Sequence, residues 1–254
     1  MTRFTGSRVL ITGGSRGIGA ATARRLAAEG AAVVLTYRSE QAAARELVAE
    51  LRGTGATAYA VGGDVGDPAQ AEAVVQAAAE HLGGLDVLVS NAGVEHFGAL
   101  EEITAEDFDR VYAVNVRGQL LVTKHAVQHM GPGARIVLMS SVSAHKSVYR
   151  HALYASSKAA VESLVRQLAL ELGDRGIAIN AIAPGGTETD MAAEVTPNYA
   201  PHRYELAPED ALRGMCALGR MARPEEIAAA VAFLASSDAS YVTGRTLAAD
   251  GGFV

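Results

Sequence analysis

The chain has 254 residues, of which 49% are hydrophobic and 5% aromatic, and it contains no Trp. Its 22 basic and 28 acidic side chains give a formal net charge of −6, so charge recruits neither nucleic acid nor an acidic membrane surface. A single cysteine, Cys216, excludes an internal disulfide framework and fits a reducing compartment. Because no secretory leader and no run of about 18 apolar residues is visible, we expect a cytoplasmic protein without a membrane partner.

Short runs rich in β-branched residues alternate along the chain with longer stretches rich in Ala, Leu and Glu. The short runs predict strands at 8–12, 32–37, 56–60, 86–90, 134–140, 177–183 and 245–249. The longer stretches predict helices at about 16–29, 39–53, 67–82, 105–130, 153–174 and 224–236. This alternation is typical of an α/β fold, so we expect one Rossmann-type domain over 1–254, with a doubly wound parallel sheet of about seven strands and helices on both faces.

One segment, 186–219, breaks this alternation after the sixth predicted strand and contains Pro197, Pro201 and Pro208. A long irregular insert in a compact domain usually has a function. Because it follows a strand at the carboxyl edge of the sheet, where doubly wound folds bind ligands, we expect it to form a lid over the substrate.

The first predicted strand runs directly into a glycine-rich turn and then into an Ala-rich helix. Gly13 permits the tight turn, Gly17 lets the backbone approach a pyrophosphate, and Gly19 allows close packing of helix and strand. The free N–H groups at the helix start attract phosphate. We therefore expect a dinucleotide site formed by Gly13, Ser15, Arg16, Gly17, Ile18 and Gly19.

The end of the second predicted strand indicates which dinucleotide binds. NAD enzymes place an acid there for the ribose 2′-hydroxyl, whereas this chain has Thr36-Tyr37-Arg38. Arg38 and Arg16 can pair with a 2′-phosphate, which favours NADP(H) over NAD(H), although each arginine could also be merely solvated. Asp64 follows the third predicted strand and is placed, with Val65, to contact the adenine, while Asp67 suits the helix N-cap.

Tyr154 and Lys158 are four residues apart in a predicted helix, so their side chains share one face. A free tyrosine hydroxyl has a pKa of about 10, which is too high for efficient proton exchange near neutral pH. A lysine ammonium roughly 4 Å away would favour the tyrosinate by up to about 4 kcal/mol, or about three pKa units. This pair therefore predicts an acid–base catalyst.

Two further polar residues complete the catalytic candidates. Ser141 ends the fifth predicted strand, where its hydroxyl can polarise a substrate carbonyl, whereas Ser140 is expected to belong to the strand end. Asn115 falls inside the long predicted helix, a position that asparagine disfavours. A local kink with a water on the exposed carbonyl would explain it and would lead protons to Lys158, although a purely structural asparagine is the alternative.

These residues together resemble the short-chain dehydrogenase/reductase family over essentially the whole chain. The run from Thr12 to Gly19 matches its TGxxxGxG pattern, the four catalytic candidates match its tetrad, and three further motifs match at Asn91-Ala92-Gly93, Pro184-Gly185 and Asp250-Gly251-Gly252. The resemblance implies a homotetramer or dimer, no metal ion, and a cofactor site that also includes Asn91, Ala92, Gly93, Tyr154, Lys158, Pro184, Gly185, Thr187 and Thr189.

The second half of the chain looks like the polyhydroxynaphthalene reductases, which reduce aromatic polyketide phenols. The similarity covers His151-Ala152-Leu153-Tyr154, the run from Pro184 to Met191, and Glu194-Val195 through Pro201. It implies that Tyr199 stacks on a planar substrate, with a packing role under the lid as the alternative. The other expected substrate contacts are Ser141, Ser143, His145, Tyr154 and Gly186, although His145 could be an ordinary loop residue.

The sequence therefore predicts an NADPH-dependent ketoreductase that acts on an aromatic polyketide or a polycyclic phenol or quinone, as in polyketide or antibiotic biosynthesis. Two other functions stay open. A 3-oxoacyl-[acyl-carrier-protein] reductase shares every general motif. A dinucleotide-sensing regulator could share the fold, although this chain keeps both Tyr154 and Lys158.

Overall fold

Seven short aliphatic runs form one parallel sheet in a computed structural model that describes residues 2–195, 198 and 214–253. The strand order is β3-β2-β1-β4-β5-β6-β7, which confirms the expected doubly wound, Rossmann-type sheet. The strands are β1 (Arg8–Thr12), β2 (Ala32–Tyr37), β3 (Ala58–Gly62), β4 (Leu85–Ser90), β5 (Met130–Met139), β6 (Ala178–Pro184) and β7 (Thr246–Ala249).

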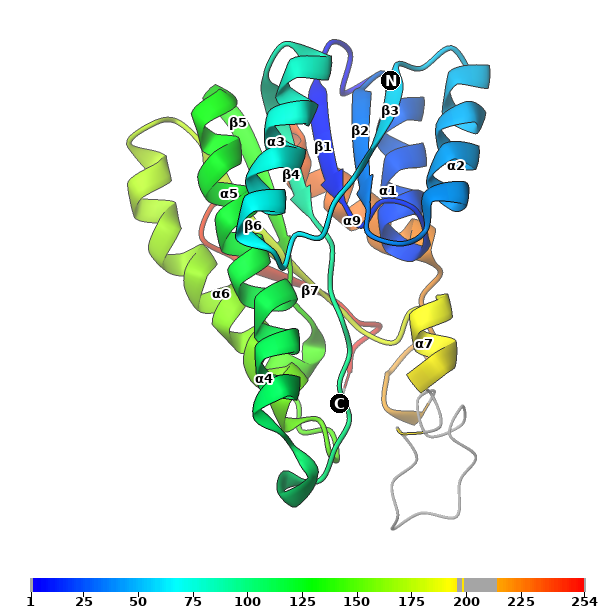
Figure 1. The fold of residues 1–254 in the computed structure, drawn as a ribbon, viewed down its shortest axis with the longest axis vertical. Helices are drawn as coiled ribbons and strands as arrows, with labels where there is room; N and C mark the ends of the chain where they lie inside the picture. Colours follow the sequence, from blue (N-terminus) through cyan, green and yellow to red (C-terminus); the bar gives the residue numbers. More distant parts are fainter. Residues whose placement is uncertain (1, 196–197, 199–213, 254) are drawn as a thin grey trace.

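Helices cover both faces of this sheet because alternate strand residues point to opposite sides. On β1, Val9 and Ile11 pack into one buried cluster while Leu10 packs into the other. The first face carries α1 (Gly17–Ala28), α2 (Gln41–Gly53) and α9 (Pro224–Ala235), and the second carries α3 (Pro68–Leu82), α5 (Gln119–Ala126) and α6 (Ala152–Gly173). Figure 1 shows α3 in front of the strands and α9 behind them.

The order of the strands reverses beside β1, since β2 pairs on one side of it and β4 on the other. Crossovers leave to opposite faces at this point, so a crevice opens at the carboxyl ends of β1 and β4. The glycine turn after β1 and the Asn91-Ala92-Gly93 segment after β4 both lie there. Among the described residues, no helix has the length and apolar content needed to cross a membrane.

The structure corrects several expected boundaries. The helix expected at 105–130 is helical from 105 to 129 but not α-helical throughout: α4 (Ala105–Tyr112) leads into a π-helical turn at Ala113–Gly118, then α5, and a 3-10 turn at Val127–His129. The third strand lies two residues later than expected, and β5 begins four residues earlier. Further 3-10 turns occur at Leu100–Glu102, Val142–Ala144 and Ser237–Ala239, and α7 (Asp190–Val195) lies within the expected lid.

Candidate active site

The glycine turn after β1 leaves no room for side chains on its inner side. Gly13 and Gly17 have φ values of 61° and 55°, a region that favours glycine. A Cβ on Gly13 would lie 2.9 Å from the Ala92 Cα, and a Cβ on Gly19 would lie 2.3 Å from the Gly13 carbonyl oxygen. The turn therefore brings backbone, and not side chains, to the mouth of the crevice.

The same turn ends at an uncapped helix. Arg16 occupies the N-cap position of α1 and its side chain makes no capping hydrogen bond, so N–H groups of the first turn are left for a ligand. Asn91 holds the turn from below, because its Nδ2 donates to the carbonyl oxygens of Thr12 and Gly13 at 3.1 and 2.9 Å. A pyrophosphate group fits such a site, where free N–H groups and the positive end of a helix dipole converge.

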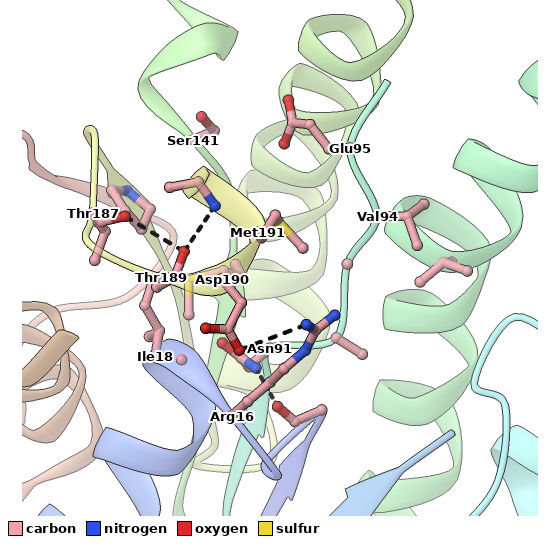
Figure 2. A pocket seen from close by; sticks show the side chains of 18 of the residues that line it. Arg16, Ile18, Asn91, Val94, Glu95, Ser141, Thr187, Thr189, Asp190 and Met191 are labelled. Atoms are coloured by element: carbon pink, nitrogen blue, oxygen red, sulfur yellow. Dashed lines mark hydrogen bonds and ion pairs between the residues drawn. The ribbon is translucent and has the colours of Figure 1, made fainter. Parts of the chain in front are cut away.

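Two arginines line the end of the crevice that lies nearest the carboxyl ends of β1 and β2. Arg16 lies 3.7 Å from Asp190 Oδ2 and 4.0 Å from Glu194 Oε1, both on α7, and Figure 2 shows the Arg16–Asp190 pair across the pocket. Arg38 lies 3.9 Å from Asp64 Oδ2. These long, exposed ion pairs contribute little energy, so both guanidinium groups can move to a phosphate. Asp67 is the N-cap of α3, as expected, where it accepts from the Gln70 N–H at 2.9 Å.

Tyr154 and Lys158 both lie on α6 and both line the crevice. The Lys158 Nζ lies 5.4 Å from the centroid of the Tyr154 ring and donates to the Met139 carbonyl oxygen at 3.0 Å. Lys158 is buried, and this burial lowers the pKa of its ammonium to about 8, with the charge of Glu95 acting in the opposite direction. Tyr154 and Lys158 thus lie together at the crevice, and desolvation holds the pKa of the lysine below its ordinary value.

Ser141 and Ser143 also line the crevice, at the end of β5 and in the following 3-10 turn. The Ser141 Oγ accepts from the Ser143 N–H at 3.2 Å, which leaves the hydroxyl proton of Ser141 available to a ligand. Ser140 has a structural role, as expected, since its Oγ donates to Glu162 Oε1 at 2.9 Å.

His145 is not part of this pocket, contrary to the expected substrate contact. Its Nε2 lies 2.8 Å from the buried carboxylate of Glu162, and it lines a separate depression between the Ser143–Arg150 loop and residues 100–101. Because a buried carboxylate needs a partner, the Glu162 pair holds the imidazole there.

Asn115 lies inside the π-helical turn, so the helix departs from α-helical geometry at the position where the sequence predicts an irregularity. Its side chain does not line the crevice: Oδ1 accepts from the Val94 N–H, and Nδ2 donates to the Val94 carbonyl and to Ser157 Oγ. Its own carbonyl oxygen accepts from Gln119 Nε2 at 2.9 Å, and the expected water on this carbonyl stays a prediction. Asn115 therefore acts by holding the segment after β4.

The described part of the segment 186–219 lines one side of the crevice. Thr187 is buried and donates to the Gly185 carbonyl oxygen at 3.0 Å, and Thr189 accepts from the Ala192 N–H at 3.1 Å at the start of α7. A Cβ on Gly17 would lie 3.3 Å from Thr189 Cγ2, so this segment reaches the glycine turn. Tyr199 lies outside the described residues.

The crevice is a pocket of about 530 Å³ that joins the cofactor and substrate candidates. Figure 2 shows Arg16 and Ile18 at one end and Ser141 at the other. Of the predicted residues, those that line it are Gly13, Ser15, Arg16, Gly17, Ile18, Arg38, Asp64, Val65, Asn91, Ala92, Gly93, Ser141, Ser143, Tyr154, Lys158, Pro184, Gly185, Gly186, Thr187 and Thr189. Gly19 and Asn115 do not line the pocket but contact residues that do: Gly19 packs against Gly13, and Asn115 bonds Val94.

Sequence reasoning missed two ionisable residues beside Tyr154. Glu95 lines the pocket and contacts His151, whose buried ring stacks on Tyr154 with centroids 4.6 Å apart. The position of Glu95, two residues after the Asn91-Ala92-Gly93 motif at the carboxyl end of a parallel strand, is a signal that could have identified it.

Comparisons with known proteins agree with this geometry. The model of the family described as enoyl-(acyl carrier protein) reductase matches residues 13–254. The chain is 44% identical to the hydroxynaphthalene reductase-like protein Arp2 of Metarhizium robertsii, covering 99% of this chain and 96% of that one. It is 41% identical to the versicolorin reductase stcU of Emericella nidulans, covering 98% and 96%.

A solved structure gives the same result. The short chain dehydrogenase of Burkholderia cenocepacia, crystallised in complex with NADP, superposes with a TM-score of 0.90 at 40% identity and covers 98% of each chain. With the family model, the relatives and the fold in agreement over nearly the full length, the chain belongs to the short-chain dehydrogenase/reductase family.

Proposed function

We propose that this protein is an NADPH-dependent ketoreductase that reduces a carbonyl of an aromatic polyketide, or of a polycyclic phenol or quinone, to an alcohol. The observation that carries the proposal is that one pocket contains the glycine turn with its uncapped helix at one end and Ser141, Tyr154 and the Lys158 ammonium at the other. Phosphate recognition and acid–base groups are thereby joined in a single crevice.

The cofactor assignment follows from charge. Arg16 and Arg38 flank the adenosine end, where charge-assisted hydrogen bonds to a 2′-phosphate distinguish NADP(H) from NAD(H). The related Burkholderia enzyme was crystallised with NADP. The bound nicotinamide supplies the hydride.

The residues of the chain perform the remaining steps. Ser141 donates a hydrogen bond to the substrate carbonyl oxygen and polarises it. Tyr154 donates its proton to that oxygen as the carbonyl carbon is reduced, so the product is a neutral alcohol and the enzyme is left with a tyrosinate. The Lys158 ammonium stabilises this anion and would also hold the cofactor through its ribose hydroxyls, and Asn115 holds the Val94 segment against the site.

The substrate class rests on the relatives and on charge. The two named relatives are a hydroxynaphthalene reductase-like protein and a versicolorin reductase. The described part of the lid exposes Asp190 and Glu194 beside the pocket, which would repel an acidic carrier protein. The relatives favour a flat, multi-ring ketone, and the acidic side chains favour a free substrate over one bound to a carrier protein.

A steady-state screen of NADPH oxidation with polycyclic quinones, naphthols and acyl thioesters tests the proposal, with NADH as the matched cofactor. We expect turnover with the ring compounds and a preference for NADPH. Turnover with acyl thioesters alone would assign the protein as a carrier-protein reductase. NADPH binding with no turnover of any class would indicate a sensor.

A further inference from the structure

A carboxylate and a buried histidine meet beside the proposed proton donor. Glu95 lies on the segment after β4, and Figure 2 shows it at the same end of the pocket as Ser141. Its Oε1 contacts the Nε2 of His151, the N-cap residue of α6. The side chains are 11% and 0% exposed, respectively, so water screens this contact weakly.

The histidine transmits this contact to Tyr154. The His151 and Tyr154 rings stack with centroids 4.6 Å apart and planes at 15°, and Phe97 stacks on His151 at 4.2 Å and 13°. A carboxylate bound to one ring nitrogen fixes the plane of an imidazole. Because the Tyr154 ring lies nearly parallel to that plane, the Glu95 contact restrains the ring that carries the reacting hydroxyl.

The segment that carries Glu95 is anchored on both sides. Asn115 bonds both backbone groups of Val94, and the Gly98 N–H donates to the Arg150 carbonyl oxygen at 2.9 Å. Arg150 adopts a φ of 57°, an unfavourable value for a residue with a Cβ, immediately before His151. A backbone strained at this point is typical of a functional constraint.

Glu95 also acts on Lys158 through its charge. Burial lowers the pKa of Lys158 to about 8, and the Glu95 carboxylate is the charge that raises it again. Among the described residues, Tyr154 faces Lys158 from the same helix, His151 stacks on Tyr154, and Glu162, one turn further along α6, is paired with His145. Loss of the Glu95 charge would therefore make the buried ammonium less favourable.

We propose that Glu95 and His151 are positioning residues for the reduction: their contact sets the plane of the ring stacked on Tyr154, and thereby the position of the reacting hydroxyl. This inference rests on the proposed ketoreductase function. Neither the Glu95 carboxylate nor the His151 imidazole transfers a proton to the substrate. Both act on the reduction rate through the position of Tyr154.

The Glu95→Gln variant keeps the size of the side chain and removes its charge. We expect kcat to fall roughly tenfold with smaller changes in the KM of ketone and NADPH, since misplacement of a reacting group lowers the rate more than binding. The alkaline limb of the pH profile of kcat should move to lower pH, because Lys158 loses its proton more readily. Glu95→Asp should return that limb toward its wild-type position, and Glu106→Gln, at an exposed site on α4, is the matched control.

A double-mutant cycle in the cofactor-free protein provides a readout that is independent of activity. His151→Phe keeps the stacked ring but leaves the Glu95 carboxylate against an apolar edge, and Glu95→Gln relieves that burial. We expect the urea midpoint of the double variant to lie higher than the sum of the two single losses predicts.

The outcomes separate the two proposals. Absence of turnover by the wild-type protein would overturn the ketoreductase function and this inference together. If the wild-type protein turns over, this inference alone would be overturned by a Glu95→Gln variant whose kcat and pH profile match those of Glu106→Gln. It would also be overturned if the shifts in urea midpoint of the two single variants simply add in the double variant. Circular dichroism confirms that each variant is folded. If Glu95→Gln is not, His151→Phe, which removes the same contact from its other partner, takes its place in the kcat measurement, and an unchanged kcat would overturn the inference.

Discussion

The side-chain amide of Asn115 bonds both backbone polar groups of Val94: Oδ1 accepts from the N–H and Nδ2 donates to the carbonyl oxygen, each at 2.9 Å. The π-helical turn at Ala113–Gly118 makes this reach possible, because it places an asparagine side chain against a neighbouring loop instead of along the helix surface. The π-helical turn thus lets Asn115 hold the segment that carries the Asn91-Ala92-Gly93 motif and Glu95.

Replacement of Asn115 by Ala should lower both stability and activity. Unsatisfied buried backbone groups cost about 1–3 kcal/mol, so we expect a loss of about 2 kcal/mol in the free energy of unfolding, measured by urea denaturation, and a large fall in kcat. Asn180→Ala is the matched control, because Asn180 bonds the Val242 carbonyl and the Arg245 N–H between β6 and β7, away from the pocket. Equal losses of kcat in both variants would contradict a specific role for Asn115.

Replacement of Arg38 by Asp should shift the cofactor preference toward NADH. The loss of a charge-assisted bond to the 2′-phosphate, worth about 1.5–3 kcal/mol, predicts a rise of about 10- to 100-fold in the KM for NADPH. An acid at this position suits the ribose 2′-hydroxyl of NADH. Arg45→Asp, on the exposed face of α2, gives the same charge change away from the adenosine end. A similar rise in the KM for NADPH in both variants would mean that the cofactor responds only to long-range charge and does not bond to Arg38.

The buried Lys158 predicts a particular dependence of stability on pH. Its pKa is lowered to about 8 in the folded protein, below the ordinary lysine value, so between these two pH values the unfolded chain binds more protons. Stability from this group therefore rises as the pH increases from about 8 toward about 10. The wild-type protein should gain stability relative to Lys158→Met across this window, as measured by urea midpoints. A constant difference would show that Lys158 titrates at its ordinary value.

Replacement of Gly19 by Ala should weaken cofactor binding. A Cβ there would lie 2.3 Å from the Gly13 carbonyl oxygen and 2.6 Å from Asn91 Nδ2, so the turn that cradles the phosphates must shift. We expect a rise in the Kd for NADPH, measured by fluorescence titration, together with a lower Tm. Gly53→Ala is the control, since a Cβ at that helical position meets nothing within 4 Å. An unchanged Kd in Gly19→Ala would contradict the role of the turn.

Local patterns were sufficient to predict the sheet and the pocket, because strand periodicity and glycine chemistry act over a few residues. The residues of the glycine turn determine that turn wherever it lies, as Thr12 through Gly19 show. The four-residue spacing of Tyr154 and Lys158 places both on one helix face. The departure from α-helical geometry within 105–130 was anticipated only at Asn115, where the residue type disfavours a helix. The π-helical turn also involves the bond between Asn115 and Val94, which lie 21 positions apart in the sequence.

The residues that were misplaced or missed depend on pairs that are distant in the sequence. His145 was expected in the pocket, but the buried Glu162 carboxylate binds it in the separate depression, and burial of that carboxylate arises only after α6 packs on β5. The Glu95–His151 contact likewise joins positions 56 apart. Such pairings form through tertiary packing, which no local pattern encodes.

Tyr154→Phe tests the central claim most directly, because it removes one oxygen from a ring whose stacking on His151 is preserved. With a ring ketone that the wild-type protein reduces, we predict that kcat falls by at least about 100-fold, the usual contribution of a general acid, while fluorescence titration shows nearly unchanged NADPH binding. Near-normal turnover in this folded, NADPH-binding variant would contradict the assignment of Tyr154 as the proton donor.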